Sequence, residues 1–298
     1  MTPHPVGRRA VAAVIVNYRS TDHALACAAS LKADGVDEIV IVDSGSGDDS
    51  VARLEAASVA TVVALARNVG YGAAANAGVA RTPAPFVIVA NADLVVAPGT
   101  VAALTGMLAD DDRLALLGPR IDRADGTRYP SARTFPSLAD SVGHGFAGLV
   151  TTDNPWSRRY LRTGSEDAGP VDWVSGACFA VRRSAFDEVG GFDDGYFMFM
   201  EDVDLCWRLH RAGWGVAYQP AGRVTHVEGV SRATAPYRMI VAHHRSLLRF
   251  GWRTGGTVDR LVLPVVAAGL AARTAILGAR TAVARGRAKS PPRADRLP

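Results

Sequence analysis

The stretch VAAVIVNY, residues 11–18, decides the fold class of this 298-residue chain. Six apolar residues, three of them valine and one isoleucine, follow one another without a polar interruption from 11 to 16. An unbroken run of this kind is typical of a strand that is buried on both faces, as in a parallel sheet. The run ends at Asn17 and Tyr18, so we expect these two side chains at the carboxyl end of the strand.

The same alternation of strand and helix continues along the first hundred residues. Further apolar runs predict strands at 38–42, 61–66 and 86–90, and helical spacing appears at 20–32, 49–57 and 73–80. Such an order predicts an α/β domain with a parallel sheet covered by helices. Ligands of these folds bind in the crevice outside the carboxyl ends of the strands.

Composition excludes several classes of protein. With 48% hydrophobic residues the chain is neither disordered nor collagen-like. Three cysteines without a CxxC spacing exclude a disulfide framework and a zinc finger, which favours a reducing cytosol. The apolar run at 11–16 is too short for a signal peptide, and no uncharged stretch reaches the roughly 18 residues of a spanning helix.

The charge is unevenly distributed. The formal net charge is +4, but residues 253–298 hold nine basic and two acidic groups, so this tail carries +7 and the rest of the chain −3. A basic tail on an acidic body indicates an anionic partner, either a nucleic acid or a membrane face.

Polar residues follow the predicted strands at the end where a ligand would bind. Asn17, Asp43, Asn91 and Asp93 all stand at such strand ends. A helix cap would explain any one of them, whereas the whole set, together with a later acidic pair and a histidine, indicates a catalytic or binding site.

A competing interpretation rests on Gly70-x-Gly72-x-x-Ala75, which follows a strand, opens a helix and has Asp93 about 20 residues later. This matches a loose dinucleotide-binding fingerprint and favours a nicotinamide-dependent oxidoreductase. The fingerprint belongs to the first strand of its unit, however, and here it follows the third.

The second half of the sequence is less regular. Residues 120–136 and 152–169 are turn-rich and basic, order returns at 171–181, and we expect a helix at 184–189, a strand at 216–218 and helical structure beyond 235. Glu201 and Asp202 open a further predicted helix at 201–212, where exposed N–H groups favour carboxylates. Asp204 is expected to face solvent or to pair with Arg208.

Read together, these motifs resemble the family 2 inverting glycosyltransferases of GT-A fold, from about residue 11 to 229. The marks of the resemblance are Val14-Ile-Val-Asn-Tyr18, Val42-Asp-Ser-Gly-Ser46, Asn68-Val-Gly-Tyr-Gly-Ala-Ala-Ala-Asn76, Asn91-Ala-Asp93 and Phe199-Met-Glu-Asp-Val-Asp-Leu205. Within the family, Leu117-Gly-Pro-Arg120, Tyr129-Pro-Ser-Ala-Arg133, Trp173-Val-Ser-Gly176 and the stretch from Val181 to Asp204 look like the actinobacterial rhamnosyltransferases that extend a lipid-linked GlcNAc.

The resemblance implies a fold and a domain organisation. The fold would be a Rossmann-like mixed sheet flanked by helices, with a C-terminal helical extension. The catalytic domain would span 1–230, with a donor-nucleotide half at about 10–113 and an acceptor half at 114–230. A helical membrane-associating region at 231–289 and a disordered tail at 290–298 would follow.

The resemblance also assigns roles. Asp202 would be the catalytic base, with Glu201 orienting the acceptor or the loop. Mg²⁺ or Mn²⁺ would be held by Asp93 and His226, with Asn91 standing where the family usually has an acid. The donor would be bound by Asn17, Tyr18, Asp43, Asn68, Gly70, Asn76, Asn91 and Asp93, and the acceptor by Trp173, Ser175, Gly176 and Arg133.

The implied reaction moves L-rhamnose from dTDP-β-L-rhamnose to the 3-hydroxyl of GlcNAc on polyprenyl diphosphate, with an α-1,3 linkage, in the biosynthesis of a cell-wall linker. The same chemistry with galactofuranose or a hexose stays open, as do the oxidoreductase and a catalytically inactive binding module. Arg128 and Arg133, or the arginines at 158, 159 and 162, are candidates for clamping the acceptor phosphates.

The C-terminal region gives two alternatives. Residues 261–272 form an apolar run between Arg260 and Arg273, and Arg273, Arg280 and Arg287 recur at intervals of seven. This suits a helix lying on an anionic leaflet at the cytoplasmic face of the plasma membrane, as in a peripheral protein. A helix packed on the catalytic domain is the alternative. With a lipid-linked acceptor the tail no longer indicates nucleic acid, and the spacing of His243 and His244 gives no reason to regard them as ligands.

Overall fold

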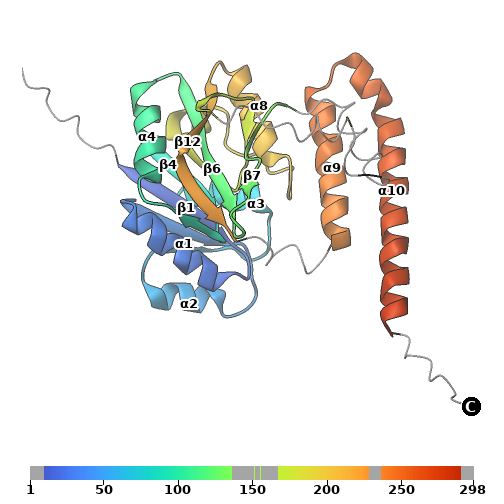
Figure 1. Ribbon diagram of the computed structural model, residues 1–298, viewed down its shortest axis with the longest axis horizontal. Coiled ribbons are helices and arrows are strands. Elements are labelled where there is room, and N and C mark those ends of the chain that lie inside the picture. Colours follow the sequence, from blue (N-terminus) through green and yellow to red (C-terminus); the bar gives the residue numbers. More distant parts are fainter. Residues whose placement is uncertain (1–9, 136–150, 152–154, 156–166, 228–235, 290–298) are drawn as a thin grey trace, which may run out of the picture.

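The computed structural model describes residues 10–135, 151, 155, 167–227 and 236–289, with backbone alone for 236–238 and 276–289. The predicted disordered tail and the arginines at 158, 159 and 162 lie outside these residues. Among the described residues, ten strands form one mixed sheet, in which eight follow the order β3-β2-β1-β4-β11-β6-β12-β5 (Figure 1).

The strands of this sheet are β1 (Val11–Asn17), β2 (Glu38–Asp43), β3 (Thr61–Ala64), β4 (Phe86–Asn91), β5 (Leu94–Val96), β6 (Leu114–Arg123), β7 (Arg128–Tyr129), β9 (Gly169–Pro170), β11 (Cys178–Arg182) and β12 (Gly215–His226). A second, two-stranded sheet pairs β8 (Ala132–Arg133) with β10 (Trp173–Val174). The helices are α1 (Thr21–Ala33), α2 (Ser50–Ala57), α3 (Tyr71–Val79), α4 (Thr100–Asp110), α7 (Arg183–Glu188), α8 (Glu201–Arg211), α9 (Pro236–Thr254) and α10 (Thr257–Lys289).

The expected parallel sheet is confirmed for the first four predicted strands. β1 lies between β2 and β4, β3 pairs with β2, and all four run parallel, with Asn17 opposite Asp43 and Val16 opposite Asn91. Their polar carboxyl ends therefore lie side by side at one edge, as the sequence predicts. Beyond β4 the sheet becomes mixed, because β11 inserts antiparallel between β4 and β6.

Two segments of the second half differ from the predicted elements. The ordered stretch 171–181 is two strands, β10 and β11, which are separated by a turn at residues 176–177, because β10 pairs with β8 in the small sheet and β11 pairs with β4 in the large one. The strand expected at 216–218 is only part of β12, which has a register shift between Gln219 and Arg223. Pro220 lies at this shift, where a proline is tolerated within a sheet.

Apolar side chains on both faces of the sheet account for its unbroken hydrophobic runs. One core packs β1, β2 and β4 against α1, α2 and α4, and the other packs the opposite face against α3, α7 and α8. Because each strand is covered on both sides, β1 and β4 bury nearly every residue.

The two C-terminal helices form an antiparallel hairpin beside this body (Figure 1). A third apolar cluster joins Leu247 and Phe250 of α9 and Val266 and Leu270 of α10 to residues 196–203 of the body. Packing of the hairpin on the rest of the chain, one of the two alternatives from the sequence, is thus observed. Among the described residues, none of the helices has the length and apolar character needed to cross a bilayer.

Candidate active site

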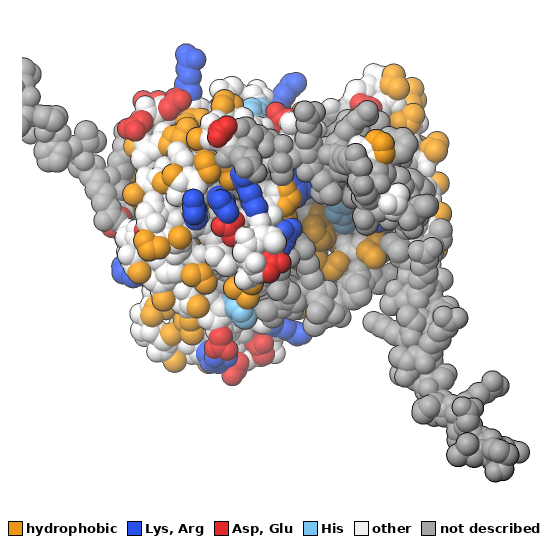
Figure 2. Space-filling view, in the orientation of Figure 1, with side chains coloured by type: hydrophobic (Ala, Val, Ile, Leu, Met, Phe, Trp, Pro, Cys, Tyr) orange, Lys and Arg blue, Asp and Glu red, His pale blue; other side chains and the backbone are white. Residues whose placement is uncertain are grey.

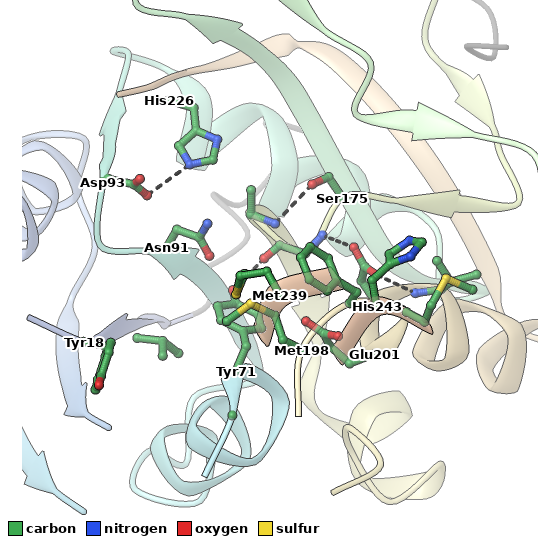
Figure 3. Close-up of a pocket in the computed structure, with 18 of the residues that line it drawn as sticks. Tyr18, Tyr71, Asn91, Asp93, Ser175, Met198, Glu201, His226, Met239 and His243 are labelled. Carbon is green, nitrogen blue, oxygen red and sulfur yellow. Dashed lines mark hydrogen bonds and ion pairs between the residues drawn. The ribbon is translucent and has the colours of Figure 1, made fainter. Parts of the chain in front are cut away.

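A cleft of about 400 Å³ opens at the carboxyl ends of β1 and β4, between the body and α9. Figure 3 shows Asp93 and His226 on one side of it and Glu201 and His243 on another. Most residues that the sequence predicts for the site line this cleft, namely Tyr18, Asn68, Gly70, Asn91, Asp93, Arg133, Trp173, Ser175, Gly176, Glu201, Asp202 and His226.

Two predicted donor-binding residues lie beneath the cleft and do not line it. Asn17 and Asp43 are both buried, and Nδ2 of Asn17 donates to Oδ2 of Asp43 at 2.9 Å. The backbone N–H of Ser46 donates to the other carboxylate oxygen of Asp43, at 2.9 Å. In this structure, therefore, these side chains hold the turn after β2 in shape next to the donor side of the cleft.

Asn76 is also directed away from the cleft. Its Nδ2 donates to the carbonyl oxygen of Phe192 at 2.8 Å, and its Oδ1 accepts from the N–H of Phe192 at 2.9 Å. The amide thus satisfies both backbone groups of one residue, which fastens α3 to the segment that leads into α8.

The loop before α3 supplies the rest of the donor side. Oδ1 of Asn68 accepts from the N–H of Gly70 at 3.0 Å. Gly70 has a φ of +94°, and a Cβ there would overlap the carbonyl of Phe197, so glycine is required for this close approach. The next residue, Tyr71, lines the cleft and donates its hydroxyl to the carbonyl of Gly176.

Asp93 and His226 form the candidate metal-binding pair. Antiparallel pairing of β12 with β5 sets His226 opposite Leu94, and Nε2 of His226 lies 3.0 Å from Oδ1 of Asp93. Nδ1 of His226 is buried without a hydrogen-bond partner, which leaves that nitrogen of the ring unused. Asn91 lies beside the pair (Figure 3).

One carboxylate and one imidazole are donors that Mn²⁺ accepts, and the carboxylate also suits Mg²⁺. Within the described part of the chain, no group of three or more His, Cys, Asp or Glu side chains could hold a metal ion. The pair therefore fits a cation whose remaining ligands come from a bound substrate and water, rather than a closed structural site.

Glu201 and Asp202 begin α8, and both line the cleft. Oδ2 of Asp202 accepts from the N–H of Gly176 at 2.8 Å, and Oδ1 accepts from the N–H of Val203 at 2.9 Å. Burial raises the pKa of Asp202, although these two N–H groups oppose the shift. A carboxylate with a raised pKa is a stronger base near neutral pH.

Glu201 has a different environment. Burial, and secondarily the negative charge of Asp202, raise its pKa to about 8. Its Oε2 is buried without a hydrogen-bond partner. A neutral carboxylic acid is the form that this apolar position favours, so Asp202 is the better placed of the two to carry the negative charge.

The acceptor side contains a stacked arginine. The guanidinium carbon of Arg133 lies 5.2 Å from the ring centroid of Trp173 and 5.8 Å from that of Tyr129. Nε of Arg133 donates to the carbonyl of Pro130 at 2.8 Å. These contacts fix the guanidinium plane at the rim of the cleft. Arg128 instead donates to the hydroxyl of Tyr218 at 2.7 Å and does not line the cleft.

Several lining residues escaped the sequence analysis. Ser44 and Tyr71 stand within the motifs at 42–46 and 68–76, so the sequence offered a usable signal for them although no role was predicted. Met239 and His243 come from α9, outside every recognised motif, and nothing in the sequence indicated them. One of the two expectations for Asp204 is confirmed, because Nε of Arg208 lies 2.7 Å from Oδ2 of Asp204. The other expectation, that Asp204 faces solvent, is wrong, because its side chain is fully buried.

Comparisons with known proteins identify the family and the fold. The model of "Glycosyl transferase family 2" matches residues 12–190. The N-acetylglucosaminyl-diphospho-decaprenol L-rhamnosyltransferase of Mycobacterium tuberculosis (strain ATCC 25618 / H37Rv) is 40% identical over 225 residues, which cover 71% of this chain and 73% of that protein. The rhamnosyltransferase WbbL of Escherichia coli (strain K12) is 40% identical over 105 residues, 35% of this chain and 38% of that one.

Two solved structures show the same fold. A mannosyltransferase from Pyrobaculum calidifontis, in complex with GDP-Man and Mn²⁺, aligns with a TM-score of 0.56 at 17% identity, covering 96% of this chain and 81% of that chain. GalNAc-T7 with UDP, GalNAc and Mn²⁺ aligns with a TM-score of 0.58 at 19% identity, covering 76% of this chain and 45% of that one.

These matches resolve the competing interpretation of the loop at 70–75. Its glycines bring α3 against the segment before α8, as Gly70 shows, and the match at 12–190 includes the whole loop. The oxidoreductase interpretation is therefore not supported. With its α/β fold of GT-A type and a family model that matches more than half of its residues, the chain belongs to glycosyl transferase family 2 and is a glycosyltransferase.

Proposed function

We propose that this enzyme transfers L-rhamnose from dTDP-β-L-rhamnose to the 3-hydroxyl of GlcNAc on a polyprenyl diphosphate, with inversion to an α-1,3 linkage. Similarity to the mycobacterial rhamnosyltransferase named above supports the sugar and the acceptor. The observation that carries the proposal is that Asp202 and the Asp93–His226 pair line one and the same cleft.

Asp202 is the base in this mechanism. Its carboxylate takes the proton of the acceptor hydroxyl while that oxygen attacks the anomeric carbon. The bond from this carbon to the diphosphate breaks on the opposite face, and its electron pair leaves with dTDP. Two backbone N–H groups hold the carboxylate in one orientation, and its raised pKa increases its affinity for the proton. Such a base contributes about 10²–10⁴-fold to the rate.

Asp93 and His226 would hold Mg²⁺ or Mn²⁺ together with the donor diphosphate. The bound cation supplies positive charge that stabilises the departing diphosphate, an effect worth several kcal/mol. Because Asn91 stands where a second acid would be, the protein offers one carboxylate and one imidazole. We therefore expect the cation to bind tightly only together with the nucleotide.

Arg133 is proposed to bind the diphosphate of the acceptor. Its guanidinium is held by two aromatic rings and a carbonyl, so little side-chain entropy is lost when an anion binds. Arg133 also lies close enough to lower the pKa of Asp202. An acceptor diphosphate bound to Arg133 would therefore affect the pKa of the base. Trp173, Ser175 and Gly176 line the same wall and would contact the GlcNAc ring.

We also propose that the enzyme is peripheral on the cytoplasmic face of the plasma membrane, with the hairpin as its contact. The outward face of α10 exposes Val258, Leu261, Val262 and Val265, at the i, i+3, i+4 and i+7 spacing of one helical face. Apolar side chains are visible along the outer edge of the hairpin in Figure 2. Together with the basic C-terminal tail, this suits an anionic leaflet.

Arg273 is not part of that outer face. Its NH1 contacts Nε2 of His244 on α9 at 2.8 Å, so this arginine ties the two helices together. The membrane contact is therefore proposed through the apolar face of α10 and not through Arg273.

A donor panel tests the proposed reaction. Purified full-length enzyme would be incubated with a short-chain polyprenyl-diphospho-GlcNAc, Mn²⁺ or Mg²⁺, and dTDP-rhamnose, UDP-galactofuranose or UDP-glucose. We expect one deoxyhexose to be added, from dTDP-rhamnose alone, in an α-1,3 linkage. A product made from a different donor would overturn the assignment of rhamnose. A β-linkage, or transfer to a different hydroxyl, would overturn the proposed stereochemistry or acceptor position.

A further inference from the structure

The segment of residues 193–204, which carries the proposed base Asp202, contains two residues with an unusual backbone conformation. Phe199 and Met200 have φ values of +67° and +66°, in the left-handed region that bulky side chains seldom adopt. Met200 is the residue before α8, and no side chain caps the helix there. This conformation turns the chain sharply into α8, so that Glu201 and Asp202 reach the cleft from the first turn. Such a conformation persists only where its surroundings hold it in place.

Helix α9 supplies much of that support. The hydroxyl of Ser246 donates to the carbonyl of Met198 at 2.8 Å. The ring of His243 packs edge-on against Phe199, with 5.3 Å between centroids. Met200 packs among Leu247 and Phe250 of the same helix.

Two arginines of α9, Arg249 and Arg253, also contact the beginning of this segment. NH2 of Arg249 contacts both carboxylate oxygens of Asp193, at 2.8 and 3.0 Å, and its guanidinium lies 5.3 Å from the ring centroid of Tyr196. A Cβ on Gly195 would overlap the Arg249 guanidinium, so the arginine lies directly on the backbone. Arg253 contacts the same carboxylate of Asp193.

Arg253 reaches the other end of the segment as well. Its Nε lies 3.6 Å from Oδ1 of Asp204, which is fully buried in the first turn of α8 and also pairs with Arg208. The hydroxyl of Tyr196 donates to the same carboxylate at 3.2 Å. Arg253 therefore bridges Asp193 and Asp204, the two ends of the segment that presents the base.

We propose that Arg249 and Arg253 are positioning residues, which hold residues 193–204 so that Asp202 faces the acceptor. This rests on the proposed role of Asp202 in transfer. Neither arginine lines the cleft, and both lie beyond the residues 12–190 that the family model matches. Helix α9 is thus part of the catalytic apparatus, in addition to its packing with α10.

The charges have an effect distinct from that of the apolar contacts. We expect the apolar contacts of α9 and α10 with the body to keep the hairpin packed when the arginines are removed, because they involve Leu247, Phe250, Val266 and Leu270 instead. Arg208 still neutralises Asp204, whereas Asp193 loses both of its arginine partners. We expect a folded enzyme in which the segment 193–200 moves more freely and the base is displaced.

The test compares Arg249→Ala/Arg253→Ala with Arg260→Ala in the full-length enzyme. Arg260 is a matched control, since it belongs to the same hairpin but contacts Trp252 and not the segment. We expect the double variant to lose between about 10- and 100-fold in kcat, the range for a misplaced catalytic group. The KM for the donor should change less than about twofold, because β1, β2 and β4 are untouched. Arg260→Ala should keep the kcat of the wild type.

A mutant cycle with Asp193→Asn separates positioning from general destabilisation. Because Asp193 has lost both of its arginine partners in the double variant, adding Asp193→Asn to that variant should lower kcat by less than about twofold further. Adding Asp193→Asn to Arg260→Ala should give the full loss of Asp193→Asn alone. An unchanged kcat in the double variant, fully additive losses, or a parallel loss of donor binding would each overturn the proposal. Absence of transfer by the wild type would instead overturn the proposed function.

Discussion

The backbone N–H of Gly176 donates to Oδ2 of Asp202 at 2.8 Å, while the carbonyl of the same glycine accepts the hydroxyl of Tyr71. One residue between β10 and β11 thus connects the candidate base with the first residue of α3. The loop before α3 and the N-terminus of α8 are therefore connected through hydrogen bonds of a single residue, Gly176.

Replacing Asp202 by asparagine should abolish transfer while the nucleotide still binds. Asparagine keeps the size of the side chain but cannot accept the proton, so we expect a loss of about 10²–10⁴-fold in kcat. Affinity for dTDP, measured by calorimetry, should change little. Asp187→Asn is a control, because this carboxylate pairs with Arg183 on α7, away from the cleft. Unchanged turnover in Asp202→Asn would remove this residue from the role of base.

Gly176→Ala should impair catalysis more than it impairs folding. A Cβ at this position would lie 3.1 Å from Cβ of Asp202 and 3.3 Å from its Oδ2. Contacts this tight should push the carboxylate out of place, so we expect about a tenfold lower kcat, with thermal unfolding shifted by a few degrees at most. Gly106→Ala, where a Cβ would meet nothing within 4 Å, should leave kcat unaltered. Equal activity in the two variants would contradict the proposed coupling.

The buried carboxyl of Glu201 should make stability depend on pH. Its pKa is raised from 4.5 to about 8, so between these values the folded state binds more protons than the unfolded state. The contribution of Glu201 to the free energy of unfolding should therefore fall as pH rises through this window, by at most about 1.4 kcal/mol per pH unit, and should level off above it.

Glu201→Gln tests this dependence, because the amide stays neutral at every pH. Urea unfolding across the window should show a shallower decline for the variant than for the wild type. Some decline should remain, because the pKa of Asp202 is raised too. Identical slopes for the two proteins would show that Glu201 is ionised in the folded state at neutral pH.

Binding of the metal should depend on the nucleotide. We expect dTDP with Mn²⁺ to raise the unfolding temperature, whereas NAD should not, because only a ligand of the folded state stabilises it. His226→Ala and Asp93→Ala should abolish the additional shift due to Mn²⁺. His23→Ala, on α1 outside the cleft lining, should retain it. Protection by NAD but not by dTDP would contradict the proposed donor.

Membrane association should depend on the outward face of α10. Leu261 and Val265 are 73% and 74% exposed, so Leu261→Asp/Val265→Asp should not disturb the packed side of the helix. We expect the variant to lose sedimentation with phosphatidylglycerol-containing vesicles but to keep its turnover on a water-soluble acceptor. Val59→Asp, at a 51% exposed position before β3, is the control. Sedimentation equal to that of the wild type would argue against the proposed contact.

The local sequence by itself determined the first half of the fold. Uninterrupted apolar runs specified β1, β2 and β4, because a strand covered on both faces must be apolar along its whole length. The alternation with helices then placed Asn17, Asp43 and Asn91 at one edge, and the register of the three strands confirms this. Recognisable motifs extended the prediction to Asp93, Asp202 and His226.

The tertiary structure decided which of these residues meet. Asp93 and His226 are 133 residues apart and come together only because β12 pairs with β5, and Gly176 reaches Asp202 because β10 and β11 are separated by a turn. Asn17, Asp43 and Asn76 belong to motifs from which we predicted binding of the sugar-nucleotide donor. In the structure their side chains form hydrogen bonds with other groups of the protein. Arg249 and Arg253 carry no motif at all, and only their contacts with Asp193 connect them to the site. Periodicity reports the burial of neighbouring residues, whereas these pairings depend on the order of strands in the sheet and on the packing of α9, which no local pattern encodes.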